Sequence, residues 1–137
     1  MLGQLHIKNI GIIDDVTNLS LKKEEININL NCETKQAQCS QTVDYVNQTN
    51  TILKTIKFHL YPQFFEEGAT ECIVPINQMN NAFPNGKSFA EFNVNRVKVE
   101  NVEKPVKYEN EHDGILSVEL NSSLMPQEKT TIYIEYD

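Results

Sequence analysis

Residues 55–65 read TIKFHLYPQFF, and this stretch decides how the rest of the chain is interpreted. Ile56, Phe58 and Leu60 fall on one face of an alternating pattern, with lysine and histidine between them, which is typical of a β-strand with one buried face. The regular strand is expected to stop at Pro62, because proline has no N–H to donate to a β-ladder. The stretch therefore predicts a strand that runs directly into an aromatic corner.

The same alternation recurs through the chain. Residues 25–32, EININLNC, place aliphatic side chains on one face and Asn27, Asn29 and Asn31 on the other, as in a sheet with one solvated face. Further strands are predicted at residues 5–13, 41–46, 52–61, 71–76, 92–99, 106–108, 116–120 and 132–136, with a bulge near 95–96. No amphipathic helix is predicted. Short strands separated by turns predict an all-β fold, an antiparallel β-sandwich with a long irregular loop around residues 62–87.

Chain length and net charge limit the classes of protein to which this sequence can belong. The 137 residues are expected to form a single domain, residues 1–137. Acidic residues outnumber basic ones, 19 to 12, and the net charge of −7 argues against nucleic acid as a partner, because phosphates bind clustered lysine and arginine. No apolar run is long enough to cross a bilayer, so no membrane segment is predicted in this chain.

An extracellular or cell-surface location is favoured over a cytoplasmic one. The last strand, residues 132–136, is interpreted as an edge strand that can pair with another copy, although the sequence does not fix the oligomeric state.

The cysteines leave two alternatives open. None of the three forms a C-x-x-C pair, which excludes a zinc ribbon and a thioredoxin motif. Cys32 and Cys39 bracket the polar residues 33–38, and if that segment is a hairpin loop the two can face each other across the strands as a disulfide. The alternative is two half-buried free thiols.

No constellation typical of catalysis is present in the sequence. A zincin helix needs two histidines one turn apart with a glutamate between them, and His6, His59 and His112 lack that spacing. The remaining alternative for a metal is a zinc site built from separate strands, for example by His59, His112 and a cysteine. No serine lies in a G-x-S-x-G turn, and the five glycines are too far apart for a phosphate loop. We therefore expect no enzyme activity from this chain, no catalytic, cofactor-binding or metal residues, and no cofactor.

Aromatic side chains cluster around the irregular middle of the chain. Exposed, they would form a partner-facing surface that grips a protein or stacks on a sugar; buried, they would close one end of the sandwich. Burial is favoured, because apolar aromatics usually serve the core. The residues of this predicted surface are Tyr61, Phe64, Phe65, Phe83 and Phe89.

Five segments in order carry a resemblance to a known family. They are 44–47 (DYVN), 53–65 (LKTIKFHLYPQFF), 83–86 (FPNG), 94–99 (VNRVKV) and 116–136 (LSVELNSSLMPQEKTTIYIEY). Together they resemble the N-terminal β-domain of bacterial aminopeptidase N-type (gluzincin) zinc metallopeptidases, which has an asparagine turn, a Leu-Tyr-Pro corner, a Pro-Asn-Gly turn and a final strand of alternating aliphatics. The resemblance covers residues 24–137 and leaves 1–23 outside it.

This resemblance implies a role without catalysis. In the family, the zinc, its ligands and the general base lie in a later domain, so no functional residue is carried over to this chain. The resemblance implies a β-sandwich domain that packs against the catalytic domain of a parent protein and helps to form its substrate cleft. The alternative is a stand-alone cell-surface module that binds a protein or a glycan.

Overall fold

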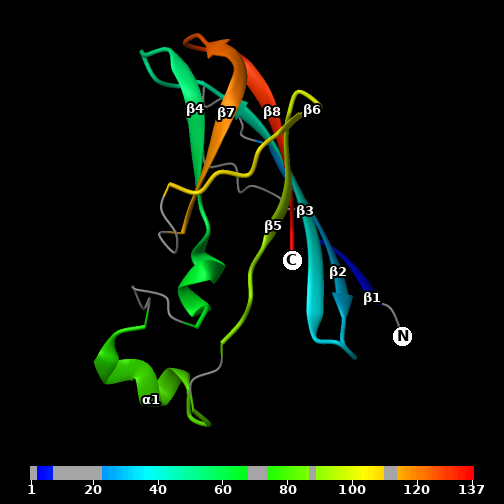
Figure 1. The fold of residues 1–137 in the computed structure, drawn as a ribbon, viewed down its shortest axis with the longest axis vertical. Coiled ribbons are helices and arrows are strands. Elements are labelled where there is room, and N and C mark those ends of the chain that lie inside the picture. Colours follow the sequence, from blue (N-terminus) through cyan, green and yellow to red (C-terminus); the bar gives the residue numbers. More distant parts are fainter. Residues whose placement is uncertain (1–2, 8–22, 68–73, 87–88, 110–113) are drawn as a thin grey trace, which may run out of the picture.

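The strands of the chain form two antiparallel sheets in the computed structural model, as the alternating sequence predicts (Figure 1). The structure describes residues 3–7, 23–67, 74–86, 89–109 and 114–137. Its elements are β1 (Gly3–Ile7), β2 (Lys23–Asn31), β3 (Gln36–Val46), β4 (Leu53–His59), η1 (Tyr61–Phe65), η2 (Ile76–Gln78), α1 (Met79–Ala82), β5 (Val94–Val99), β6 (Val102–Lys104), β7 (Ile115–Leu124) and β8 (Lys129–Tyr136). The fold is all-β, with antiparallel sheets in a sandwich.

The larger sheet has six strands in the order β1-β2-β3-β8-β5-β6. Its β8 strand pairs with β3 on one side and with β5 on the other. The expectation that residues 132–136 form an edge strand is therefore wrong, because both edges of β8 are already hydrogen-bonded. The described edges of this sheet are β1 and β6.

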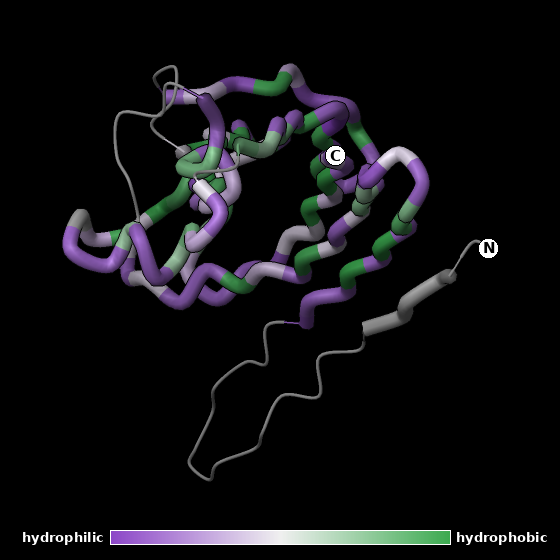
Figure 2. Tube along the Cα trace, turned by 90° about the horizontal axis from the view of Figure 1, so that it is seen from below, coloured by the Kyte–Doolittle hydropathy of each residue, from purple (hydrophilic) through white to green (hydrophobic). Residues whose placement is uncertain are grey.

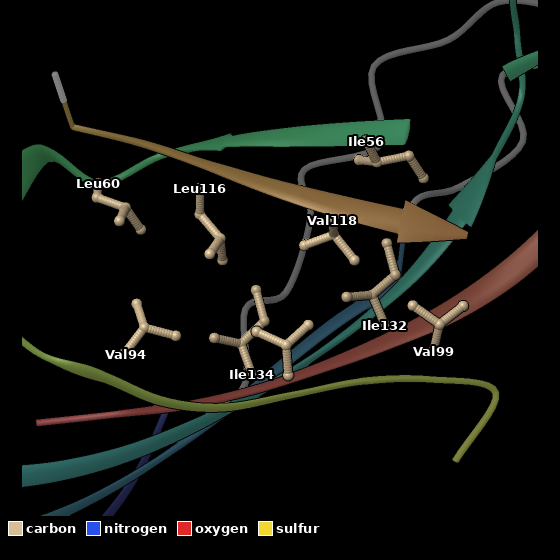
Figure 3. Close-up of a cluster of buried hydrophobic side chains, with 9 residues drawn as sticks. Ile56, Leu60, Val94, Val99, Leu116, Val118, Ile132 and Ile134 are labelled. Carbon is tan, nitrogen blue, oxygen red and sulfur yellow. The ribbon is translucent and has the colours of Figure 1, made fainter. Parts of the chain in front are cut away.

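The smaller sheet pairs β4 with β7, and its inner face covers part of the larger sheet. Apolar side chains from the two sheets meet between them. Leu116 and Ile132 are both 0% exposed. Figure 3 shows the side chains of the small sheet pointing toward those of the large one. The buried cluster contains Ile56, Leu60, Val94, Val97, Val99, Leu116, Val118, Ile132 and Ile134.

Period-two alternation places the two faces of the large sheet as the sequence predicts. Asn27, Asn29 and Asn31 are exposed, whereas Ile26 and Ile28 are half-buried. Leu30, which was expected on the buried face, is 45% exposed near the end of β2. Bands of polar and apolar residues alternate along the strands in Figure 2. The predicted bulge is confirmed as well, because the pairing of β5 with β8 shifts register between Val94 and Arg96.

The irregular middle of the chain lies beyond one end of β4 (Figure 1). It contains two 3₁₀ turns and the four-residue helix α1, where the sequence predicted no helix. Of the short strand expected at residues 71–76, positions 71–73 lie outside the described residues, and position 76 begins η2 instead. The strand expected at 106–108 is a short bridge between Tyr108 and Leu116. Of the strand expected at residues 5–13, β1 covers Leu5 to Ile7, and positions 8–13 are not described.

Candidate functional site

The aromatic corner begins where β4 ends. Leu60 is buried, and its backbone N–H donates a 2.6 Å hydrogen bond to the carbonyl of Gly114, which fixes the exit of the strand. Pro62 is the second residue of η1. In the first turn of a helix a backbone N–H has no intrahelical partner, so the missing N–H of proline costs no hydrogen bond, and its fixed φ suits a helical turn. The change from extended to helical backbone at Tyr61 turns the side chains that follow out of the sheet.

The rings of this corner are ordered against one another. The His59 and Tyr61 rings are stacked, with centroids 5.7 Å apart and planes 19° from parallel. The Tyr61 and Phe64 rings are tilted by 46°, with centroids 6.4 Å apart. His59 and Tyr61 are both exposed, so this short aromatic ladder is displayed at the surface on a rigid strand end.

The structure separates the five residues of the predicted partner-facing surface by exposure. Tyr61 is 62% exposed and Phe89 is 47% exposed, while Phe64, Phe65 and Phe83 are half-buried. The backbone N–H of Ala90 donates to the carbonyl of Phe65 at 3.1 Å, which brings the segment that carries Phe89 beside η1. Phe83 follows α1 as its C-terminal cap, and in the described part of the chain no ring contact joins it to Tyr61 or Phe64. The expected burial of these aromatics is thus wrong for Tyr61 and Phe89 and partial for the other three.

Gln63 is a buried polar residue within the corner, which sequence reasoning did not single out. It is 8% exposed, and its Oε1 has no hydrogen-bond partner among the residues that the structure describes. An acceptor buried in this way is unfavourable unless a donor reaches it. Glutamine at a turn gives no signal in the sequence that would have marked it as buried.

Of the two alternatives for Cys32 and Cys39, the structure has free thiols and no disulfide. The hairpin loop is tighter than expected, because β2 and β3 continue to the pair Asn31 and Gln36, and Cys32 lies in the turn. Cys39 instead pairs across the strands with Ile28, too far along the ladder to reach Cys32. Cys39 is half-buried, and burial, followed by the charge of Asp137, raises the pKa of its thiol.

The histidines are not gathered into one place by the described structure. His59 belongs to the aromatic corner, His6 lies in β1, and His112 is outside the described residues. Within the described ranges, no group of three or more His, Cys, Asp or Glu side chains is arranged to hold a metal ion.

Comparison with known proteins gives no relative. No family model, no curated protein and no solved structure matches the chain. In the part of the chain that the structure describes, no helix has the length and apolar character that crossing a membrane requires.

Proposed function

We propose that this chain is a non-catalytic β-sandwich domain that packs against another protein domain through its aromatic corner. The observation that carries this proposal is the ladder of His59, Tyr61 and Phe64, with Tyr61 62% exposed on a strand end that a backbone hydrogen bond fixes. Large aromatic side chains held in place on a surface are typical anchors of protein interfaces, because they bury much area at little conformational entropy.

The partner proposed is the catalytic domain of an aminopeptidase-like zinc metallopeptidase. The sequence resemblance over residues 24–137 supports it, and the domain would help to wall the substrate cleft.

The test begins with the reading frame that contains this chain. We expect sequence encoding an H-E-x-x-H helix downstream of Asp137, and we expect that downstream segment, produced separately, to form a complex with this chain. Tyr61→Ser should weaken the complex by at least about tenfold, because an exposed anchor is lost. Ile52→Ser is the matched control, since Ile52 is 53% exposed but lies away from the corner, in the turn before β4.

Two results would contradict the proposal. One is peptide hydrolysis by this chain alone that a chelator abolishes, because the chain would then be an enzyme. The other is a complex that forms equally well with the Tyr61→Ser and Ile52→Ser variants, because the corner would then not be the contact surface.

A further inference from the structure

The outer face of the large sheet, which points away from the small sheet, carries polar side chains in register. Across the strands, Asn27 lies opposite Ser40, and Ser40 lies opposite Glu135. Glu135 lies in turn opposite Arg96 of β5. A second row begins one pleat further along, where Asn29 lies opposite Gln38. Paired side chains in an antiparallel sheet lie about 4.5–5.5 Å apart at Cβ, so these residues form one continuous surface.

This surface is hollowed. A pocket of about 670 Å³ is lined by Asn27, Ile28, Asn29, Gln38, Cys39, Ser40, Asn95, Tyr133, Glu135 and Tyr136. Ile28, Cys39 and Tyr136 have the opposite parity, so they offer backbone rather than side chains to the hollow. The volume lies within the range of about 300–1,000 Å³ that small-molecule sites occupy. The strands give it a rigid floor.

Three side-chain amides of the hollow have no partner in the described part of the chain. They belong to Asn27, Asn29 and Gln38, for which no side-chain hydrogen bond to a described residue is formed. Each amide offers both donors and an acceptor. Glu135 is oriented from two sides, because the Tyr133 hydroxyl donates to its Oε1 at 2.7 Å and Arg96 Nη1 lies 3.3 Å from its Oε2. A carboxylate held in this way keeps further lone pairs for a ligand's hydroxyl groups.

We propose that this hollow binds a neutral oligosaccharide, with the amides of Asn27, Asn29 and Gln38 and the carboxylate of Glu135 as hydrogen-bonding groups. A sugar presents many hydroxyl groups, each of which both donates and accepts, and this matches a floor of amides, a hydroxyl and a carboxylate. A protein partner would gain little, because interface anchors are aromatic or apolar and the floor offers no aliphatic side chain. The Tyr133 ring is partly covered by Lys98, whose Nζ lies 5.6 Å from the ring centroid.

The charges in the hollow and the net charge of the chain both favour a neutral ligand. The carboxylate of Glu135 lies beside the guanidinium of Arg96, so the floor has no excess of positive charge to attract an anion. The whole chain has a net charge of −7, which repels anionic polysaccharides at long range. The site is open and polar, so we expect dissociation constants in the millimolar range.

The experiment is a titration of the full ¹⁵N-labelled chain, followed by backbone amide NMR shifts. The probes are neutral oligosaccharides of glucose, galactose, mannose and N-acetylglucosamine. We expect at least one of them to give saturable shifts at residues 27–29, 38–40 and 133–135. Glu135→Gln and the double variant Asn27→Ala with Asn29→Ala should each weaken that binding by about tenfold or more, which is the loss expected for one or two hydrogen bonds. Asn50→Ala is the matched control, because it removes an exposed amide from a turn away from the hollow and should leave the affinity unchanged.

The proposal is overturned if no probe gives saturable shifts, since the face would then be only the solvated side of a sheet. Shifts that centre on Tyr61 and Phe64 would overturn it as well, because the sugar would then stack on the aromatic corner. Equal affinity in the double variant and in Asn50→Ala would also overturn the proposal, because Asn27 and Asn29 would then contribute nothing to binding. The double variant changes only exposed side chains, so it keeps the test decisive even if Glu135→Gln fails to fold.

Discussion

The side-chain amide of Asn47 donates a 3.0 Å hydrogen bond to the carbonyl of Leu124, although 77 residues separate the two in the sequence. The same Nδ2 donates to the carbonyl of Thr51 at 2.8 Å, and Oδ1 accepts from the backbone N–H and the hydroxyl of Thr49. The backbone of Asn47 pairs with Glu128 and Gln127. One residue, 0% exposed, therefore ties the turn between β3 and β4 to the turn between β7 and β8.

We expect Asn47→Ala to lower the free energy of unfolding by about 3 kcal/mol, because it removes the donor to the buried carbonyl of Leu124 and the acceptor of the Thr49 backbone N–H. Urea unfolding followed by circular dichroism measures this change. Asn50→Ala, in the same turn but exposed, should change stability by no more than about 0.5 kcal/mol. Similar losses in the two variants would show that the buried network of Asn47 contributes nothing specific.

Much of the fold could be predicted, because alternation reports which face of a strand is buried. The outward asparagines of β2, the inward Leu116 and Val118 of β7 and the bulge beside Arg96 all followed from parity alone. Parity does not report which strands are neighbours. The central place of β8 depends on pairing between residues about 90 positions apart, and nothing local to residues 132–136 indicates it.

The hairpin loop between β2 and β3 is shorter than residues 33–38, the segment that the sequence indicated, and the reason is a side chain. The turn is closed by the side chain of Asn31, whose Oδ1 accepts from the backbone N–H groups of Glu33 and Thr34, and by Lys35 with φ of 57°. Asn31 has the right parity for an ordinary outward strand residue, so its capping role was not visible. That capping shortens the loop and places Cys32 in the turn.

Gly114 lies against the ring of Phe64, and its φ is +62°. A Cβ added there would lie 3.0 Å from Phe64 Cζ, so Gly114→Ala combines backbone strain with crowding of the aromatic corner. We expect a loss of about 2–3 kcal/mol in the free energy of unfolding. Gly86→Ala is the control, since Gly86 has φ +93° but nothing within 4 Å of the added Cβ, and it should cost only about 1 kcal/mol.

The comparison of these two glycines isolates the contact with Phe64. If the two alanine variants lose the same stability, backbone strain alone explains both, and the packing of the corner is loose. Phe64→Leu combined with Gly114→Ala should recover part of the loss, because a smaller side chain removes the crowding while the strained backbone remains.

The candidate sites were less visible in the sequence than the fold. The five aromatics were identified from their clustering, but their exposure depends on how η1 and the segment around Phe89 lie beside β4. The outer-face hollow was missed altogether. Its residues come from β2, β3, β8 and β5, and only the register between those strands places Asn27, Ser40 and Glu135 in one row.

Cys39 should react with thiol reagents more slowly than Cys32. Cys39 is half-buried and its pKa is raised by burial and by Asp137, so less thiolate is present at neutral pH, whereas Cys32 is exposed in a turn. In a Cys72→Ser background, we expect two phases of modification by a disulfide reagent, separated by about tenfold or more. Cys32→Ser should remove the fast phase and Cys39→Ser the slow one. In concentrated urea the two rates should converge, and separate rates there would contradict the role of the fold.

Tyr133 and Glu135 give the chain a stability that depends on pH. The hydrogen bond from the Tyr133 hydroxyl to Glu135, followed by burial, raises the pKa of this tyrosine above its ordinary value of 10.0. The folded chain then holds the phenolic proton more tightly than the unfolded chain does. The resulting stabilisation is fully present below pH 10 and is lost as the pH rises through the folded pKa.

We therefore expect the free energy of unfolding of the native chain to fall more steeply above about pH 10 than that of Tyr133→Phe, which has no phenolic proton to lose. All other ionisable groups are common to the two proteins, so the difference between the two curves is the quantity to measure, by urea unfolding at successive pH values. The difference will be modest, because Tyr133 is only half-buried and solvent screens the interaction. Glu135→Gln removes the first cause of the shift and should bring the tyrosinate absorbance titration of Tyr133 to lower pH. Parallel stability curves for the native chain and Tyr133→Phe would show that the bond to Glu135 does not hold the proton, and the orientation of that carboxylate in the hollow would then rest on Arg96 alone.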